Sequence, residues 1–251
     1  MFLVTLAAEV LRSPVALIDR IEKDGTLAEE APRLLALLVL GALVFGGVAG
    51  GYRGGLQVPF AAVKLPILLL VPTVLVLPAV QGLWGLCDVE VSYRRLTLAA
   101  LTGGARMALL AAAAGPVLWL AFGVLGYHSS VLFFALLLAI CGLPGLLVVA
   151  RTVPSGGRAR FVALAGSLAL LGLSTMQTGW MLRPFLLRPQ AESAVFLRPV
   201  EDDVFSALGL TTASSQGYYR STVDAIERSS DVVVPYERQE AVSPRDGESR
   251  R

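Results

Sequence analysis

Long apolar stretches alternate with short polar segments over the middle of the chain. A helix that crosses a membrane needs about 20 mostly apolar residues, and five stretches reach roughly this length. They run over residues 34–51, 65–86, 107–125, 131–150 and 161–182. The strict apolar–polar alternation typical of membrane β-barrels does not recur in the sequence. The pattern therefore predicts an all-α fold, a polytopic membrane helix bundle of about five transmembrane helices over residues 34–182.

The N-terminal segment, residues 1–33, has an amphipathic pattern. From Phe2 to Ile21 the charged residues lie largely away from one apolar face. That face contains Leu3, Leu6, Val10, Leu17 and Ile21. Such a helix lies in the headgroup plane of a membrane or packs against a partner, and we favour the headgroup plane. Gly25 and Pro32 are expected to break the chain before the first span.

The C-terminal segment, residues 183–251, is a polar tail. It carries nine basic and eleven acidic residues. A short helix over 218–228 and a short strand over 231–236 are compatible with its pattern. After about residue 237 hardly any side chain can be buried, and we expect disorder there. The tail is too small and polar for a catalytic domain, which favours a docking arm.

Composition supports the membrane class. Of 251 residues, 55% are hydrophobic and 16% are charged, whereas soluble domains carry about 25% charged residues. This excludes an ordinary soluble enzyme and a disordered chain. The net charge is +2, without the clustered basic face that a nucleic-acid partner would require.

The distribution of Lys and Arg predicts the orientation, because cytoplasmic loops carry an excess of these residues. Ten lie at one side of the predicted spans: Arg12, Arg20, Lys23, Arg33, Arg94, Arg95, Arg106, Arg151, Arg158 and Arg160. Five lie at the other: Arg53, Lys64, Arg183, Arg188 and Arg198. We expect a bacterial inner-membrane protein with a cytoplasmic N-terminus and a periplasmic C-terminus. A re-entrant second span would invert every later assignment.

Two patterns inside the spans have structural interpretations. Gly47, Gly51 and Gly55 are four residues apart and predict a helix-packing face, against a helix of this chain or of another subunit. The second span contains three prolines, each of which removes a backbone donor and favours a kink. They are Pro66, Pro72 and Pro78. Unwound backbone of the kind that transporters use to bind substrate is the functional alternative.

The sequence offers little catalytic chemistry. The predicted spans contain no Asp, Glu or His, which are the usual ligands of coupling ions in transporters. No carboxylate occurs between Val91 and Ala191, and the single histidine, His128, lies in a short loop. No phosphate-binding loop, nucleophile motif or metal-ligand spacing is present. We therefore predict no catalytic residue, no metal site, no cofactor and no enzymatic activity.

The end of the last span predicts a docking segment or a well-anchored helix end. Gln177 is polar within the span and can bond between helices. Trp180 suits the aromatic belt, and Arg183 can reach lipid headgroups. Pro184 ends the helix and Phe185 follows it.

Three motifs carry a family resemblance. They are GGLQVPFAAVKLPILLL at 54–70, MQTGWMLRPF at 176–185 and FLRPV at 196–200. They are similar to a family of uncharacterised bacterial multi-pass inner-membrane proteins. That family resembles, in helix number, the Yip-type (Ypt-interacting) membrane proteins. The resemblance implies architecture and carries no activity with it.

The function predicted from these features is a non-catalytic integral membrane subunit or scaffold that packs within or anchors a larger complex. Its expected partners are other membrane protein subunits and lipid headgroups. The alternative is an uncoupled transporter or channel for a small solute, which would need a water-lined cavity around the prolines of the second span. A lipid-modifying enzyme and membrane shaping of the Yip type are further alternatives.

Overall fold

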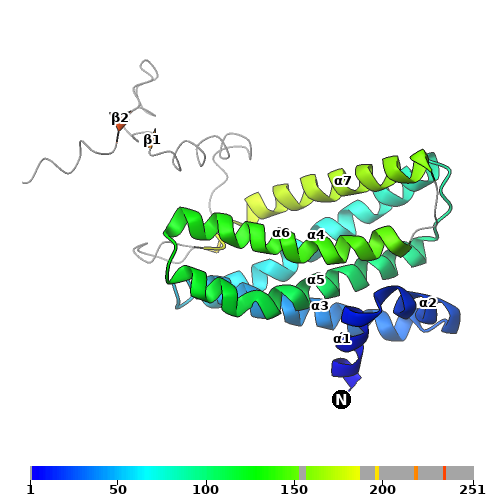
Figure 1. The fold of residues 1–251 in the computed structure, drawn as a ribbon, viewed down its shortest axis with the longest axis horizontal. Helices are drawn as coiled ribbons and strands as arrows, with labels where there is room; N and C mark the ends of the chain where they lie inside the picture. The colour runs from blue at the N-terminus through cyan, green and yellow to red at the C-terminus, as the bar shows by residue number, and fades with distance from the viewer. Residues whose placement is uncertain (1, 153–156, 187–195, 198–217, 220–233, 236–251) are drawn as a thin grey trace, which may run out of the picture. The chain divides into compact units, whose positions relative to one another are not determined.

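The computed structural model describes residues 2–152, 157–186, 196–197, 218–219 and 234–235. Two short helices and five long ones make up nearly all of this part of the chain (Figure 1). They are α1 (Phe2–Arg12), α2 (Pro14–Asp24), α3 (Leu27–Gly50), α4 (Gln57–Leu86), α5 (Tyr93–Phe122), α6 (Tyr127–Thr152) and α7 (Arg158–Leu182). The five long helices are long and apolar enough to cross a membrane. By length and composition the chain is therefore a multi-pass membrane protein with an all-α fold.

The C-terminal residues from Val200 form a separate unit. In its described part, β1 (Tyr218–Tyr219) pairs antiparallel with β2 (Val234–Pro235). The second strand falls within the predicted strand, but the predicted helix begins as a strand instead. The rest of the tail, including the disorder expected after residue 237, lies outside the described residues.

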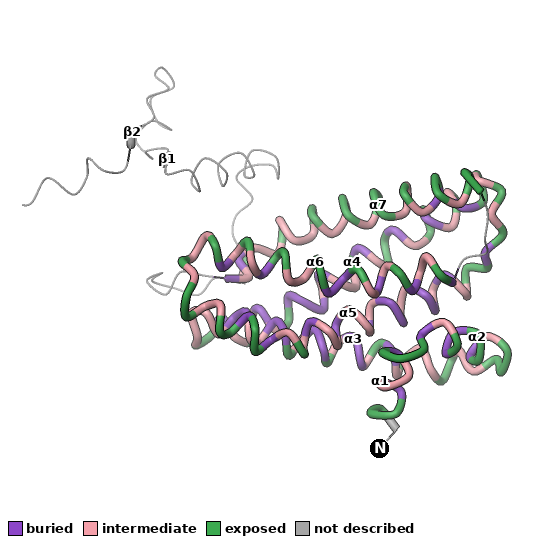
Figure 2. The backbone as a smooth tube through the Cα atoms, viewed as in Figure 1, coloured by how far each residue is buried: buried purple, intermediate pink, exposed green. Residues whose placement is uncertain are grey.

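Each long helix runs antiparallel to the next, so that the bundle has two ends (Figure 1). Helix α3 packs against α4 and α5, α5 packs against α6, and α4 packs against α7. The order of packing is therefore α7–α4–α3–α5–α6. Helix α7 packs chiefly against α4, and most of its surface is exposed or half-buried (Figure 2). Trp84 of α4 is fully buried and donates a 3.0 Å hydrogen bond to the Ser167 hydroxyl of α7.

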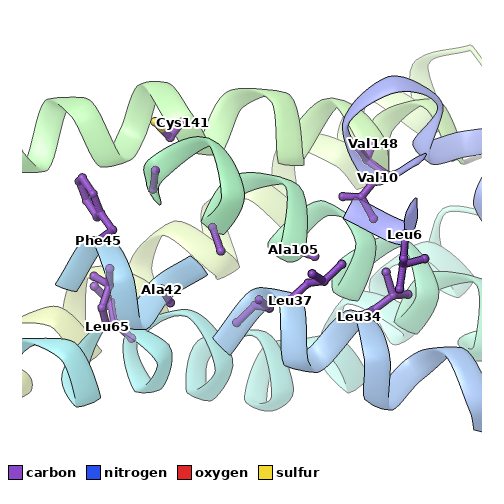
Figure 3. Packing of buried hydrophobic residues seen from close by; sticks show 14 of the residues in the cluster. Leu6, Val10, Leu34, Leu37, Ala42, Phe45, Leu65, Ala105, Cys141 and Val148 are labelled. Carbon is purple, nitrogen blue, oxygen red and sulfur yellow. The ribbon is translucent and has the colours of Figure 1, made fainter. Parts of the chain in front are cut away.

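Glycines bring the helix backbones close together. A Cβ added at Gly46 or Gly50 of α3 would lie 2.5 Å from a backbone oxygen of α4, and one at Gly41 would lie 2.7 Å from the backbone of Ala108 in α5. Gly103 of α5 and Gly145 of α6 approach each other in the same way. Small residues allow such contacts between membrane helices, which explains why these positions lack side chains. Bulkier apolar residues fill the core between them (Figure 3).

The N-terminal segment differs from the prediction in two respects. First, it forms two helices, with Pro14 beginning the second, and Gly25 ends that helix in the left-handed region at a φ of 71°. Pro32 lies inside α3 and does not end it. Second, the apolar face predicted to meet lipid is buried against the bundle. Of the residues predicted for this face, Leu6, Val10, Leu17 and Ile21 are buried, whereas Leu3 is 41% exposed. The face is covered because α1 and α2 pack on α3 and α5 of the same chain.

Arginines hold this pair of helices in place. Arg95 of α5 forms ion pairs with Asp19 and Glu22 of α2, and it donates a 3.0 Å hydrogen bond to the Thr152 carbonyl at the end of α6. One side chain thus joins three helices at the end of the bundle that carries α1 and α2.

Candidate functional site

The three glycines predicted to form one helix-packing face, Gly47, Gly51 and Gly55, have different surroundings in the structure. Gly51 packs within the chain, because a Cβ there would lie 2.6 Å from the Trp119 ring of α5. Gly47 faces open space, with no atom within 4 Å of an added Cβ. Gly55 lies in the turn after α3 at a φ of 59°, and its carbonyl accepts a 3.2 Å hydrogen bond from the Val58 N–H at the start of α4. The contact with α4 uses Gly46 and Gly50, one position along, because that face of α3 points toward α4.

The three prolines all lie inside a single continuous helix, α4. Pro66 and Pro72 are buried, whereas Pro78 is exposed. Helix α4 has 30 residues, which at 1.5 Å per residue is about 45 Å, longer than the roughly 30 Å hydrocarbon core of a bilayer. The length of α4 supports a full crossing of the membrane. The kinks expected at the three prolines stay a prediction.

The predicted docking segment at the end of α7 turns back into the bundle. Gln177 remains exposed on α7, and the Arg183 guanidinium lies 3.2 Å from the centre of the Trp180 ring. The chain then leaves the helix and buries Pro184 and Leu186. We call residues 183–186 the C-terminal strap, and the end of the bundle where they lie the strap end.

Two fully buried polar side chains of α4 hold the strap. Gln57 donates through Nε2 to the Pro184 carbonyl at 3.1 Å and to the Phe185 carbonyl at 2.9 Å. Lys64, two turns later on α4, donates through Nζ to the same Pro184 carbonyl at 2.9 Å. The strap is neither helix nor strand, so these side chains satisfy carbonyl groups that would otherwise be buried without a partner.

Helix α6 and aromatic rings complete the strap's surroundings. The Tyr127 hydroxyl donates to the Leu186 carbonyl at 3.3 Å, and the Phe134 ring stacks on Phe185 with centroids 5.9 Å apart. The strap therefore joins α4 to α6, which are not neighbours in the packing order. Lys64 also lies 5.0 Å from the ring centroid of Phe196, within the range of a cation–π contact.

The charge at this site is distinctive. All acidic residues in the described part of the chain belong to α1, α2, the start of α3 or the α4–α5 turn, at the opposite end. Within the described residues, the buried Lys64 ammonium therefore lies beside a carbonyl and a ring and has no carboxylate next to it. An ionisable group inside a membrane helix is costly and usually has a functional or structural role. Here its role is to bind the strap.

The sequence interpretation missed this site. Lys64 stands just before the predicted second span, which begins at residue 65, whereas α4 begins at Gln57, seven residues before Lys64. Gln57 and Lys64 are seven residues apart, which places them on one face of a helix. That spacing is the signal that sequence analysis had available.

A cleft of about 790 Å³ opens at the end of the bundle opposite the strap. It is lined by Glu22, Gln81, Gly85, Asp88, Val89, Glu90, Val91, Ser92 and Arg95. The cleft lies beside the α4–α5 turn and includes none of the α4 prolines. Within the described ranges no group of three or more His, Cys, Asp or Glu side chains is arranged to hold a metal ion.

Comparisons with known proteins found no protein-family model, no curated protein and no solved structure that matches the chain. The structure establishes a five-helix, membrane-type bundle, and the motif resemblance rests on sequence alone.

Proposed function

We propose that the protein is a non-catalytic integral membrane subunit that packs within or anchors a larger membrane protein complex. The observation that carries this proposal is a set of uncovered glycines in the spanning helices. No atom of the described residues lies within 4 Å of a Cβ added at Gly47 of α3, Gly82 of α4 or Gly172 of α7. In membranes, glycines are enriched where helices meet closely, so uncovered ones are suited to helices of another subunit.

The exposed face of α6 provides the contrast. Its large exposed side chains are Leu132, Leu136, Ile140, Leu143 and Leu147. A face of bulky aliphatic side chains is suited to lipid chains. Helix α7 also exposes bulky apolar side chains. It differs from α6 in exposing a glycine, Gly172, and an amide, Gln177, within its apolar part, where the glycines of α6 are buried. An exposed amide within a spanning helix favours a hydrogen-bonding partner over lipid. We therefore assign α7 and the adjoining face of α4 to subunit contacts.

The same proposal includes a bacterial inner membrane and an orientation with the N-terminus in the cytoplasm. Five antiparallel spans bring the ten basic residues named above to the end that carries α1 and α2, in accord with the positive-inside rule. The continuous α4 supports this orientation, because a re-entrant second span would invert it. The strap end then faces the periplasm.

Gly172→Leu is expected to release partner subunits while the bundle stays folded. The new side chain enters open space in this chain, but it would separate α7 from a closely packed partner helix. The measurement is extraction of native membranes in mild detergent, followed by sizing and quantitative mass spectrometry of co-eluting proteins. We expect the partner-to-protein ratio to fall at least about tenfold, which corresponds to about 1.4 kcal/mol.

Ala139→Leu is the matched control, because Ala139 is an exposed small residue on the bulky face of α6. It should leave the ratio unchanged. Equal ratios for wild type, Gly172→Leu and Ala139→Leu would contradict the assignment of α7 to a subunit contact.

A further inference from the structure

Helix α1 has a second apolar face that the bundle does not cover. Leu6 and Val10 are buried, as described above. On the outer side, Val4 is 75% exposed and Leu11 is 37% exposed. With Ala8 between them, these residues follow the i, i+4, i+7 spacing of one helix face. A helix that is apolar on both sides is poorly suited to water.

The contacts of α1 place it where the apolar parts of the long helices begin. Arg106 is the last charged residue of α5 before its apolar part, and it donates to the Leu11 carbonyl at 3.1 Å. On α3 the corresponding last charge is Arg33, and the next residue, Leu34, belongs to the same buried cluster as Leu6 (Figure 3). Two spanning helices thus place α1 at the boundary between polar and apolar surface.

The direction and charge of α1 suit the same location. The helix runs crosswise to the long helices, with its N-terminal end pointing away from the bundle (Figure 1). It would therefore lie along a membrane surface that the long helices cross. Its single acidic residue, Glu9, accepts two hydrogen bonds from Arg20, at 3.1 and 2.6 Å. The hydrogen bond to Glu9 raises the pKa of Arg20, which favours its charged form.

We propose that the outer face of α1 is a lipid-binding surface, inserted at the boundary between headgroups and acyl chains beside the bundle. Val4, Ala8 and Leu11 enter the lipid, while Leu6 and Val10 attach the helix to α3 and α5. The occupant is the bilayer itself, because the outer face continues the lipid-facing surface of the long helices at the depth where their apolar parts begin. The inference is independent of the proposed function, since it needs no partner subunit.

An environment-sensitive probe tests this placement. In a full-length background with Cys87→Ser and Cys141→Ala, a nitrobenzoxadiazole label is attached to Val4→Cys, and the protein is placed in phosphatidylcholine nanodiscs. Iodide then quenches probes in water, and spin-labelled phosphatidylcholine quenches probes in lipid. We expect iodide quenching at Val4→Cys to be several-fold weaker than at Asp24→Cys, and lipid quenching to be strong.

The two reference positions define the scale. Asp24 is exposed at the end of α2 and should report water, whereas Leu143 lies on the bulky face of α6 and should report lipid when changed to cysteine. Iodide quenching at Val4→Cys equal to that at Asp24→Cys would place the face in water and overturn the proposal. Shielding from both quenchers would overturn it too, because protein would then cover the face.

Discussion

Gly103→Leu is expected to destabilise the bundle strongly. An added Cβ at Gly103 would lie 2.7 Å from the backbone oxygen of Gly145, and one at Gly145 would lie 2.5 Å from that of Gly103. Neither backbone can rotate away as a side chain would, so α5 and α6 must separate. Overpacking typically costs about 1–3 kcal/mol, and a clash between two backbones belongs at or above the upper end of that range. This is a large part of a total stability that can be as low as about 5 kcal/mol. In size-exclusion chromatography, we expect the variant to lose its monodisperse peak.

Gly82→Leu is the control for this prediction. It makes the same change in a spanning helix, but an added Cβ at Gly82 meets no atom within 4 Å. It should elute like the wild type after stringent detergent has removed partners. A normal monodisperse peak for Gly103→Leu would show that the close approach of α5 and α6 is not required for folding.

Lys64→Met is expected to loosen the strap without unfolding the bundle. Methionine keeps the apolar length of the side chain but loses the hydrogen bond to the Pro184 carbonyl. A hydrogen bond to a charged group contributes about 1.5–3 kcal/mol, so the strap should open roughly 10- to 100-fold more often. The reporter is Leu186→Cys in the background without native cysteines, because Leu186 is 3% exposed in the closed strap. We expect a water-soluble maleimide to label it faster by this factor.

Val63→Met is the matched control, since Val63 is the exposed neighbour of Lys64 on α4. It should leave the labelling rate of Leu186→Cys unchanged. If Lys64→Met also left the rate unchanged, the buried ammonium would have no part in holding the strap.

The number and order of the long helices could be predicted from the sequence, because a spanning helix must satisfy its backbone groups internally and be apolar over its length. The helix ends could not. Predicted span starts at residues 65 and 107 fall well inside α4 and α5, which begin at Gln57 and Tyr93. Hydropathy reports only the part of a helix that is embedded in lipid, whereas α4 and α5 continue into more polar sequence. For this reason the predicted second span leaves out Lys64, which lies inside α4.

Helix-packing partners were less predictable than helix positions. Gly46 and Gly50 are four residues apart, and so are Gly47 and Gly51. Which of the two pairs packs against α4 depends on how α3 is rotated about its own axis, and the sequence pattern does not give that rotation. For α1 and α2, the apolar face was recognised but its neighbour was not, because a lipid surface and a protein surface require the same pattern. The strap depends on contacts more than 100 residues apart, such as Lys64 with Pro184.

The central claim is that α7 meets another subunit, and crosslinking in native membranes tests it most directly. A photoreactive amino acid replaces Gly172 in one variant and Ala139 in another, and adducts formed on illumination are separated by mass. We expect a discrete adduct with a second protein from position 172 and none from position 139. The absence of a protein adduct at both positions would show that α7 faces lipid and not another subunit.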